Sequence, residues 1–490
     1  MPHFPYTYIR MARDEERLSD KLASVPEVEQ FDLVVIGAGP AGEKAAAQTA
    51  YFKKRVAIVE CEPEPGGAAV HTGTLPSKTL RETALYLSGY HARELYGVAL
   101  ELDRSATLPR LMSRKNAIAA AESASFRKNL AQHDVKYVQG HGRFVDAHTV
   151  AVNSTSGERL LSAEVILIAT GSKPHRPPDI DFADDWIHDS DEILTINDIP
   201  TSLTILGGGV IGCEYACMFA ALGVGITLVD ARAEILPFLD AEIVTRLKAA
   251  MLKLGIVLVQ GQRWTTVLRS ANGVVTTLSD GRTIENQQLL FAAGRTGRVS
   301  DLGLENVGLA ADSRGYIPVD REFRTKVPSI FAAGDVIGFP ALASVSMEQG
   351  RVAMCHAFGF SYKQAVATEM PYGIYTIPEV SSYGETEETC RQKQIDYVCG
   401  RGLFENNARG KITGDREGIT KLLVDAKTRK LIGVHVIGER ATELVHIGQT
   451  AIHLGATVDL FIDMVFNYPT LADSYKYAAY HCLAALMAKQ

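Results

Sequence analysis

The order of apolar and polar positions along the chain predicts two stretches with the same architecture. In the first, the apolar run Leu33–Ile36 predicts a strand buried on both faces, Pro40–Tyr51 predicts an alanine-rich helix, and Arg55–Val59 predicts a second buried strand. The same order of strand, helix and strand recurs between residues 203 and 229. Because a strand, a crossover helix and a second strand form a parallel pair, we expect an α/β protein with two such units.

Further elements follow from the same patterns. Leu108–Gln132 predicts a long helix, and Val165–Ala169 predicts a strand. Beyond Met370, strands such as Leu431–Ile437 alternate with amphipathic helices, which predicts a separate α+β domain. Residues 1–30 are polar with few apolar anchors, so they predict a surface helix or an extension outside the fold.

Each unit has a glycine-rich loop between its first strand and its helix. Residues without a Cβ let the backbone approach a pyrophosphate, and the helix N-terminus offers N–H donors to that anion. An acidic residue, Glu60 or Asp230, stands 23 residues after the first glycine of each loop, where a carboxylate can accept hydrogen bonds from a ribose. The sequence therefore predicts two dinucleotide sites of Rossmann type; the alternative is a pair of turns that bind no ligand. The loop glycines are Gly37, Gly39 and Gly42 in the first unit and Gly207, Gly209 and Gly212 in the second.

The second acidic residue bears on nucleotide preference. A carboxylate at Asp230 favours the 2′-hydroxyl of NAD and repels the 2′-phosphate of NADP. Arg232 stands two residues later and can offset this repulsion by pairing with the phosphate. Its alternative interpretation is a solvated loop residue, and both interpretations stay open.

Composition and charge remove several classes of protein. The 490 residues fit about three to four domains. A hydrophobic fraction of 46% with 22% charged residues is ordinary for a globular enzyme, and a net charge of −7 argues against a nucleic-acid binder. The longest apolar stretch, Leu203–Val229, contains six glycines and Glu214, so no membrane association is expected. The seven cysteines include no C-x-x-C pair, which predicts a reduced, cytoplasmic setting and no metal site.

Four further segments resemble the flavoprotein disulfide reductases, the class I pyridine nucleotide-disulfide oxidoreductases. They are Gly66–Lys78, Ala169–Ser172, Phe331–Val336 and Phe466–Thr470, in that family's order. The resemblance implies FAD on the first loop, a nicotinamide nucleotide (NAD(H) or NADP(H)) as substrate on the second, and a C-terminal α+β domain that forms a homodimer. It implies an extension at 1–30, FAD-binding parts at 31–172 and 299–368, an NAD(P)-binding domain at 173–298 and a dimerisation domain at 369–490.

The resemblance also carries site residues. The family's Lys–Glu pair beside the flavin corresponds to Lys78 and Glu214, although a lysine at a helix start and a glutamate after a glycine loop are commonplace. Tyr468 stands where the family has its base histidine, so it either shapes the flavin pocket as a third catalytic residue or packs at a subunit boundary. Arg81 either contacts a nucleotide phosphate or forms a surface salt bridge. Besides the loop glycines and their acids, the residues implied to bind FAD are Gly67, Thr74, Lys78, Thr170, Gly171, Asp335 and Ala343, and those implied to bind NAD(P) are Arg232 and Gly294.

The redox thiols of that family are missing. A C-x-x-x-x-C pair passes electrons from flavin to sulfur in the reductases, and Ala69 and Thr74 occupy the two positions here. Cys213 and Cys217 lie at i,i+4 on a helix and are expected to be buried apolar residues rather than a redox couple. Electrons that enter as hydride can therefore be held only on a flavin, and they leave to a second nicotinamide, a quinone or oxygen.

Within the family, several segments resemble the soluble pyridine nucleotide transhydrogenases. This chain departs from that branch at two positions. The branch keeps the first cysteine where this chain has Ala69, and it has a neutral residue where this chain has Asp230. Three hypotheses follow: an NAD(P) transhydrogenase with ping-pong kinetics through FAD, an NADH dehydrogenase or diaphorase that reduces quinone or oxygen, and a non-catalytic flavin- and NAD-binding redox sensor that uses residues 1–30. The segments are Gly212–Ala216, Ala293–Gly297, Gly373–Glu379 and Phe466–Thr470.

Overall fold

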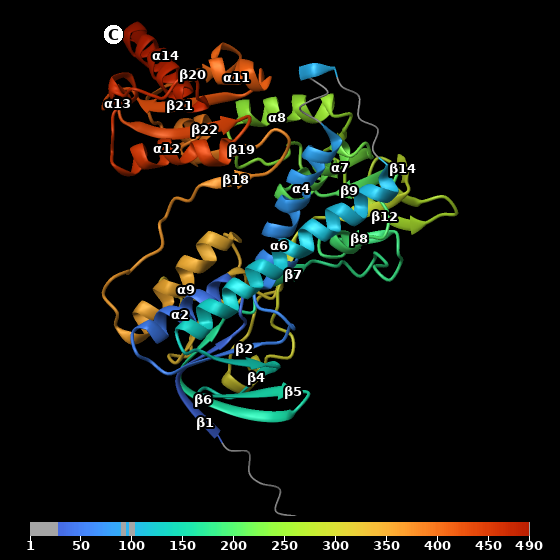
Figure 1. Ribbon diagram of the computed structural model, residues 1–490, viewed down its shortest axis with the longest axis vertical. Coiled ribbons are helices and arrows are strands. Elements are labelled where there is room, and N and C mark those ends of the chain that lie inside the picture. The colour runs from blue at the N-terminus through green and yellow to red at the C-terminus, as the bar shows by residue number, and fades with distance from the viewer. Residues whose placement is uncertain (1–27, 90–94, 98–102, 490) are drawn as a thin grey trace, which may run out of the picture. The chain divides into compact units, whose positions relative to one another are not determined.

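The computed structural model describes residues 28–89, 95–97 and 103–489 (Figure 1). The chain divides into two compact units. The first comprises the described residues up to Gly66 together with Ser125–Gly171 and Gly297–Ala365. The second comprises the described residues of Gly67–Ala124, with Ser172–Thr296 and the described residues from Val366 onward. The predicted extension lies outside the described residues as far as position 27.

The first unit is built on a mostly parallel sheet. Apolar residues alternate along its first strand: Leu33 and Val35 pack towards helices, while Val34 and Ile36 pack on the opposite face against residues such as Phe144. Two helices that contact each other and the C-terminal part of a third supply the apolar side chains of the helical face (Figure 1). The strands are β1 (Val28–Ile36), β2 (Val56–Glu60), β3 (Lys136–Gln139), β4 (His141–Asp146), β5 (Thr149–Ser154), β6 (Gly157–Ile168) and β17 (Ile330–Ala332), and the helices are α2 (Pro40–Tyr51), α9 (Ala343–Phe358) and α6 (Arg104–Gln132).

The second unit contains another parallel sheet, with strand order β11-β10-β9-β15-β8. Helix α4 packs against α7, the helix that follows the glycine loop of this sheet. A three-stranded antiparallel sheet, which the sequence patterns did not reveal, lies between α8 and β15 in the chain. The elements are α3 (Gly67–His71), α4 (Thr74–Ser88), β7 (Ser172–Pro174), β8 (Ile187–Asp189), β9 (Ser202–Leu206), α7 (Val210–Ala221), β10 (Gly225–Asp230), α8 (Ala241–Lys253), β11 (Val257–Gln260), β12 (Trp264–Arg269), β13 (Val274–Leu278), β14 (Thr283–Asn286), β15 (Gln288–Phe291) and β16 (Arg295–Gly297).

The C-terminal part of this unit is an α+β fold around an antiparallel sheet of order β18-β19-β22-β21-β20. Its core includes Phe404, Phe461 and Tyr475, and helices α12 and α14 contact the sheet. The elements are β18 (Tyr372–Ile374), β19 (Val380–Gly384), α10 (Glu387–Gln392), β20 (Tyr397–Leu403), α11 (Ala408–Thr413), β21 (Ile419–Asp425), β22 (Leu431–Ile437), α12 (Ala441–His453), α13 (Asp459–Asp463) and α14 (Ser474–Lys489).

The predicted fold class is confirmed, and most predicted elements begin and end within one or two residues of their observed bounds. Three elements start earlier than predicted: β6 at Gly157 rather than Val165, and α6 at Arg104 rather than Leu108. The third is β1, which starts at Val28 rather than Leu33. Its first residues pair with β6, for example Val28 with Leu160, and this pairing extends the strand beyond its apolar run. Within the residues that the structure describes, no helix combines the length and apolar character needed to cross a bilayer.

Candidate functional site

The first glycine loop connects β1 to α2 in the first unit. Gly37 has a φ of +107°, and a Cβ there would overlap the carbonyl of Ala169; a Cβ at Gly42 would overlap the carbonyl of Gly37. Gly39 is the N-cap of α2, and no side chain caps the N-terminal N–H groups of that helix. A tight backbone turn at an uncapped helix N-terminus fits a pyrophosphate, so the residues present agree with a dinucleotide on this loop.

The acid of the first unit lies at the carboxyl end of β2. Glu60 is buried and accepts hydrogen bonds from the N–H of Ala38 at 2.7 Å and of Glu62 at 2.9 Å. It therefore stands directly beside the loop, where a ribose hydroxyl is expected. The neighbouring Cys61 is a poor nucleophile, because burial and the nearby carboxylates raise the pKa of its thiol to about 11.

Four other predicted FAD residues of the first unit lie on segments that follow its strands. Thr170 donates a hydrogen bond to the carbonyl of Arg298 at 2.6 Å, and Gly171 has a φ of +71° with open space where a Cβ would be. Asp335 begins a short 3₁₀ turn after β17, and Ala343 begins α9. A Cβ at Gly350 of α9 would overlap the backbone of Ala41, so α9 and α2 approach closely.

The second glycine loop repeats this geometry between β9 and α7. Gly207 has a φ of +117°, and a Cβ there would lie 2.7 Å from the carbonyl oxygen of Ala292. A Cβ at Gly212 would overlap the carbonyl of Gly207. Gly209 is the uncapped N-cap of α7, with open space beside it. Gly294, also predicted to bind the nucleotide, is exposed with a φ of +125°.

Asp230 and Arg232 form one hydrogen-bonded unit at the end of β10. Asp230 accepts from Gly208 N–H at 2.5 Å, from Arg232 N–H at 2.7 Å, and from the Arg232 guanidinium through Nε at 2.9 Å and Nη2 at 2.7 Å. These bonds to the anion hold the pKa of Asp230 below its usual value, against the effect of burial. The carboxylate is buried and the guanidinium is half exposed, so the arginine covers the acid on the side that faces solvent.

Lys78 and Glu214 are brought together from α4 and α7, although 136 residues separate them. The Lys78 ammonium donates to Glu214 Oε2 at 2.6 Å, and the N–H of Tyr375 donates to Glu214 Oε1 at 2.9 Å. The ammonium also lies 5.0 Å from the centre of the Tyr375 ring. The predicted pair therefore exists in the fold, and Tyr375 is a third member that motif reading missed.

Arg81, one turn further along α4, was expected to meet a nucleotide phosphate or to form a surface salt bridge. The structure shows ion pairs with the exposed Glu82 and with Glu379, so a salt bridge is present, but the arginine side chain itself is buried rather than on the surface. Its guanidinium donates to the carbonyl of Thr376 through Nε at 3.1 Å and Nη2 at 2.9 Å, and it pairs with Glu379 at 3.3 Å. Arg81 thus fixes the segment between β18 and β19.

The segment that holds the redox thiols in the disulfide reductases forms α3 and the start of α4 here. Gly67 opens α3, Ala69 lies within it, and Thr74 is the exposed first residue of α4. Cys213 and Cys217 are fully buried, as expected; burial raises the pKa of Cys217 to about 12 and that of Cys213 well above its usual value. All seven cysteines are free thiols.

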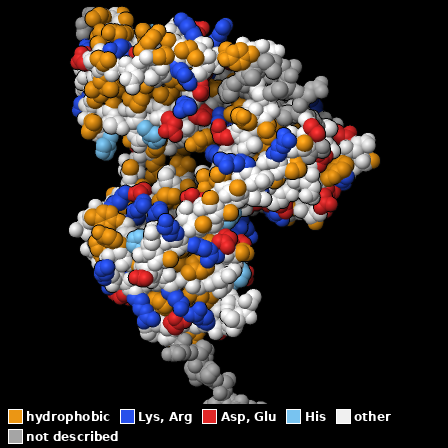
Figure 2. All heavy atoms as spheres, in the orientation of Figure 1, with side chains coloured by type: hydrophobic (Ala, Val, Ile, Leu, Met, Phe, Trp, Pro, Cys, Tyr) orange, Lys and Arg blue, Asp and Glu red, His pale blue; other side chains and the backbone are white. Residues whose placement is uncertain are grey.

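Tyr468 is 77% exposed in the single chain, so the described residues of one subunit do not bury it. Other large apolar side chains on the same C-terminal domain are exposed too, and Figure 2 shows hydrophobic groups gathered over it. Such a concentration is typical of a surface that another subunit covers. The exposed residues include Leu454, Val465, Tyr468, Tyr477, Tyr480 and Met487.

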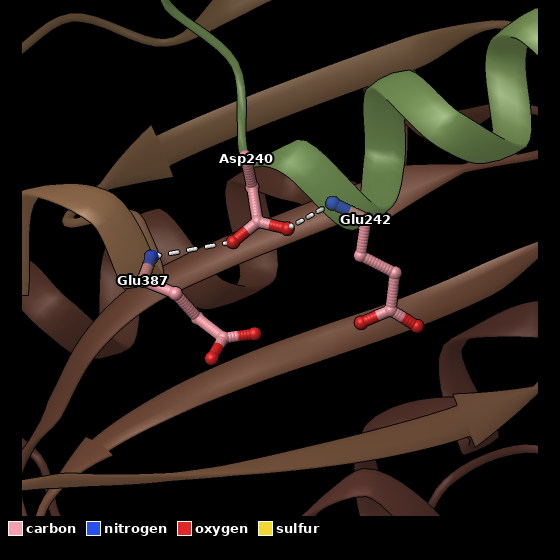
Figure 3. Close-up of side chains that lie close together, drawn as sticks. All are labelled: Asp240, Glu242 and Glu387. Atoms are coloured by element: carbon pink, nitrogen blue, oxygen red, sulfur yellow. Dashed lines mark hydrogen bonds between the residues drawn. The ribbon is translucent and has the colours of Figure 1, made fainter.

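A second group of charged residues joins α8 to the C-terminal sheet. The carboxylates of Asp240, Glu242 and Glu387 lie close enough together to resemble metal ligands, and Asp240 accepts from the N–H of both glutamates (Figure 3). The fully buried ammonium of Lys421 pairs with all three, at 2.8, 3.1 and 2.5 Å. A lysine therefore supplies the cation that these acids require. The one sequence signal for it is a lysine within the apolar strand β21.

Two uncapped glycine loops, each with an acid at the end of the next strand, define an oxidoreductase fold with two dinucleotide sites. The sequence profile described as pyridine nucleotide-disulphide oxidoreductase matches residues 31–350, and that of the family's dimerisation domain matches residues 370–479. The chain belongs to the pyridine nucleotide-disulphide oxidoreductase family. As a member of this family the protein uses FAD and a nicotinamide nucleotide and forms a homodimer, as predicted.

Individual relatives agree with this assignment. The soluble pyridine nucleotide transhydrogenase of Mycobacterium bovis is 44% identical over 452 residues, 92% of this chain and 96% of that protein. The protein of the same name from Marinomonas sp. is 39% identical over 453 residues, 92% and 97% of the two chains. Among solved structures, LpdA from Mycobacterium tuberculosis has a TM-score of 0.84 at 30% identity, and the Cu(II) complex of the HOCl-induced flavoprotein disulfide reductase RclA from Escherichia coli has 0.84 at 26%; each match covers 92% of this chain and 99% of the other.

Proposed function

We propose that the protein is a flavin-dependent NAD(P) transhydrogenase that transfers hydride between nicotinamide nucleotides without a redox disulfide. The observation that carries the proposal is the intact pair of dinucleotide loops in a chain whose thiol positions are Ala69 and Thr74. Relatives that carry the name transhydrogenase and match almost the whole chain support it. A reduced, cytoplasmic setting fits the free cysteines.

Each residue group has a defined part in this proposal. When bound, FAD supplies a two-electron store between the two nucleotides. The first loop and Glu60 would hold its pyrophosphate and ribose, and Thr170, Gly171, Asp335 and Ala343 are the other residues of the first unit assigned to the cofactor. The second loop and Asp230 or Arg232 hold each nicotinamide nucleotide in turn.

Lys78 provides the positive charge that stabilises negative charge developing on the ring, and Glu214 holds the ammonium by its 2.6 Å ion pair. A fixed charge is effective because no reorganisation is needed when the hydride moves. Tyr468, exposed on the dimerisation domain, completes the pocket from the partner subunit or packs at the boundary. No thiolate is available at Ala69 or Thr74, so no general base is required for sulfur chemistry.

A second candidate is an NADH dehydrogenase or diaphorase with quinone or oxygen as acceptor. The buried, ionised Asp230 favours it, since a carboxylate beside the ribose discriminates against NADP. Arg232 argues for the transhydrogenase, because the same loop carries a cation for the 2′-phosphate.

The deciding experiment is anaerobic. Purified holoenzyme is mixed with NADPH and thio-NAD, and formation of reduced thio-NAD is followed by absorbance. Initial rates are measured at varied concentrations of both nucleotides, and double-reciprocal plots with parallel lines are expected for a ping-pong reaction. Turnover with quinone alone would establish the diaphorase instead, and flavin bleaching without turnover to any acceptor would leave only the redox sensor.

A further inference from the structure

Tyr375 touches both members of the Lys78–Glu214 pair. Its backbone N–H donates to Glu214 Oε1 at 2.9 Å, while Lys78 donates to Oε2 of the same carboxylate at 2.6 Å. Its ring centre lies 5.0 Å from the Lys78 ammonium, within the range of a cation–π contact. The ammonium also donates to Ser77 Oγ at 3.3 Å, and outside its own helix it is held from two directions, by a carboxylate and by the face of an aromatic ring.

The Tyr375 ring is suited to this contact at any working pH. Burial raises the pKa of its hydroxyl, so the phenol stays neutral and contributes the attraction of its π face without a competing negative charge. The ammonium keeps some exposure, since 23% of the Lys78 side chain is accessible, whereas Glu214 is buried. A partly exposed lysine has many rotamers, and a ring on one side restricts them.

The segment that carries Tyr375 is itself fixed on two sides. Arg81 of α4, one turn from Lys78, donates twice to the carbonyl of Thr376. Glu379 pairs with Arg81 and accepts from the N–H of Thr442 at 3.3 Å and from its hydroxyl at 2.9 Å, at the start of α12. The segment that carries the ring is thus bonded both to α4, the helix of Lys78, and to α12 of the dimerisation domain. These bonds hold the ring in place relative to both helices.

We infer that Tyr375 is a positioning residue for the Lys78 ammonium, through which the dimerisation domain sets where that charge stands. The inference rests on the proposed function, in which Lys78 stabilises charge on the flavin. Tyr375 touches no reacting atom in this scheme; it acts through Lys78. Its backbone contact to Glu214 persists in any substitution except proline, so side-chain variants leave that contact in place. Tyr375→Phe removes only the hydroxyl, which bonds to Thr442, and Tyr375→Leu removes the ring as well.

The test compares Tyr375→Leu with Tyr375→Phe, which keeps the ring, in full-length holoenzyme. From the strength of cation–π contacts we expect Tyr375→Leu to slow anaerobic flavin reduction by saturating NADH by about three- to tenfold, and Tyr375→Phe to stay within about twofold. In Tyr375→Leu the flavin midpoint potential, measured by dye equilibration, should fall by about 15 to 30 mV. This is the three- to tenfold change converted at about 30 mV per tenfold for a two-electron couple. Tyr86→Leu, an exposed tyrosine on α4, is the matched control.

A double-mutant cycle separates positioning through Lys78 from a general structural effect. If Tyr375 acts through the ammonium, Tyr375→Leu has no further effect on rate or potential in a Lys78→Met background. An equal effect in both backgrounds would overturn the inference, as would a Tyr375→Leu enzyme with wild-type rate and potential while Lys78→Met is slow. If Lys78→Met is itself as fast as the wild type, the assigned role of Lys78 fails first. Should Tyr375→Leu lose FAD, Tyr375→Met fills the same space and is subject to the same criteria.

Discussion

Nucleotide preference is expected to depend on the Asp230–Arg232 pair, and two substitutions shift it in opposite directions. Asp230→Asn removes the negative charge but keeps an oxygen that can accept from Gly208 N–H, which now donates at 2.5 Å. The asparagine amide cannot accept both guanidinium bonds, so Arg232 is released towards the nucleotide. Arg232→Ala keeps the acid and removes the cation.

The magnitude follows from the bonds involved. A hydrogen bond to a charged group contributes about 1.5 to 3 kcal/mol, and 1.4 kcal/mol corresponds to about tenfold. Asp230→Asn weakens the bond to the NADH ribose and removes repulsion of the 2′-phosphate, so the ratio of kcat/KM for NADPH over NADH should rise about tenfold or more. Arg232→Ala loses the phosphate contact and exposes the uncompensated carboxylate, so the same ratio should fall about tenfold or more.

The assay is anaerobic flavin reduction at varied NADH or NADPH, with thio-NAD turnover as a second measure. Arg263→Ala, on the loop before β12, is a surface arginine of the same unit and serves as the control. FAD content and thermal midpoint confirm that each variant is folded. A ratio that stays at the wild-type value in both Asp230→Asn and Arg232→Ala would show that this loop does not select the nucleotide, and the reasoning from the 2′-position would be wrong.

Three further predictions concern the electron store and the buried ion cluster. Dithionite titration of the anaerobic protein should consume two electrons per subunit, because Ala69 and Thr74 cannot form a disulfide; uptake of four would refute this. Lys421→Met should destabilise the fold by about 3 to 5 kcal/mol, since it leaves three carboxylates without their buried cation; an unchanged thermal midpoint would contradict that. Arg401 and Lys421 hold the pKa of Glu242 at about 2 against an ordinary 4.5, so the stability from this group is complete above pH 4.5 and is lost as pH falls towards 2. In Glu242→Gln the thermal midpoint should therefore fall less between pH 4.5 and pH 2 than in the wild type. An equally steep fall would argue against the ion pairs of Glu242 with Arg401 and Lys421.

Two features that the sequence patterns missed, the start of β1 and the burial of Arg81, depend on contacts with segments far away in the chain. Strand β1 extends back to Val28 because it pairs with β6, while residues such as Glu29 and Asp32 break the apolar pattern that marks a buried strand. Arg81 looked like a surface or phosphate-binding residue, since an arginine on a helix is usually exposed. Only the docking of the segment at Thr376 against α4 shows that its guanidinium is satisfied inside the protein.

The sequence by itself determined the elements that depend on neighbouring residues: the βαβ units, the two glycine loops with an acid 23 residues on, and the loss of both thiol positions. These are local, because glycine conformation and helix N-termini act within a few residues of the chain. Lys78 and Glu214, 136 residues apart, were paired in advance only through the family resemblance, whereas tertiary structure alone brought Lys421 to Asp240 across 181 residues and Tyr375 to Lys78. Ion pairs and ring contacts depend on distance in space, which sheet topology and helix packing set and which residue spacing does not encode.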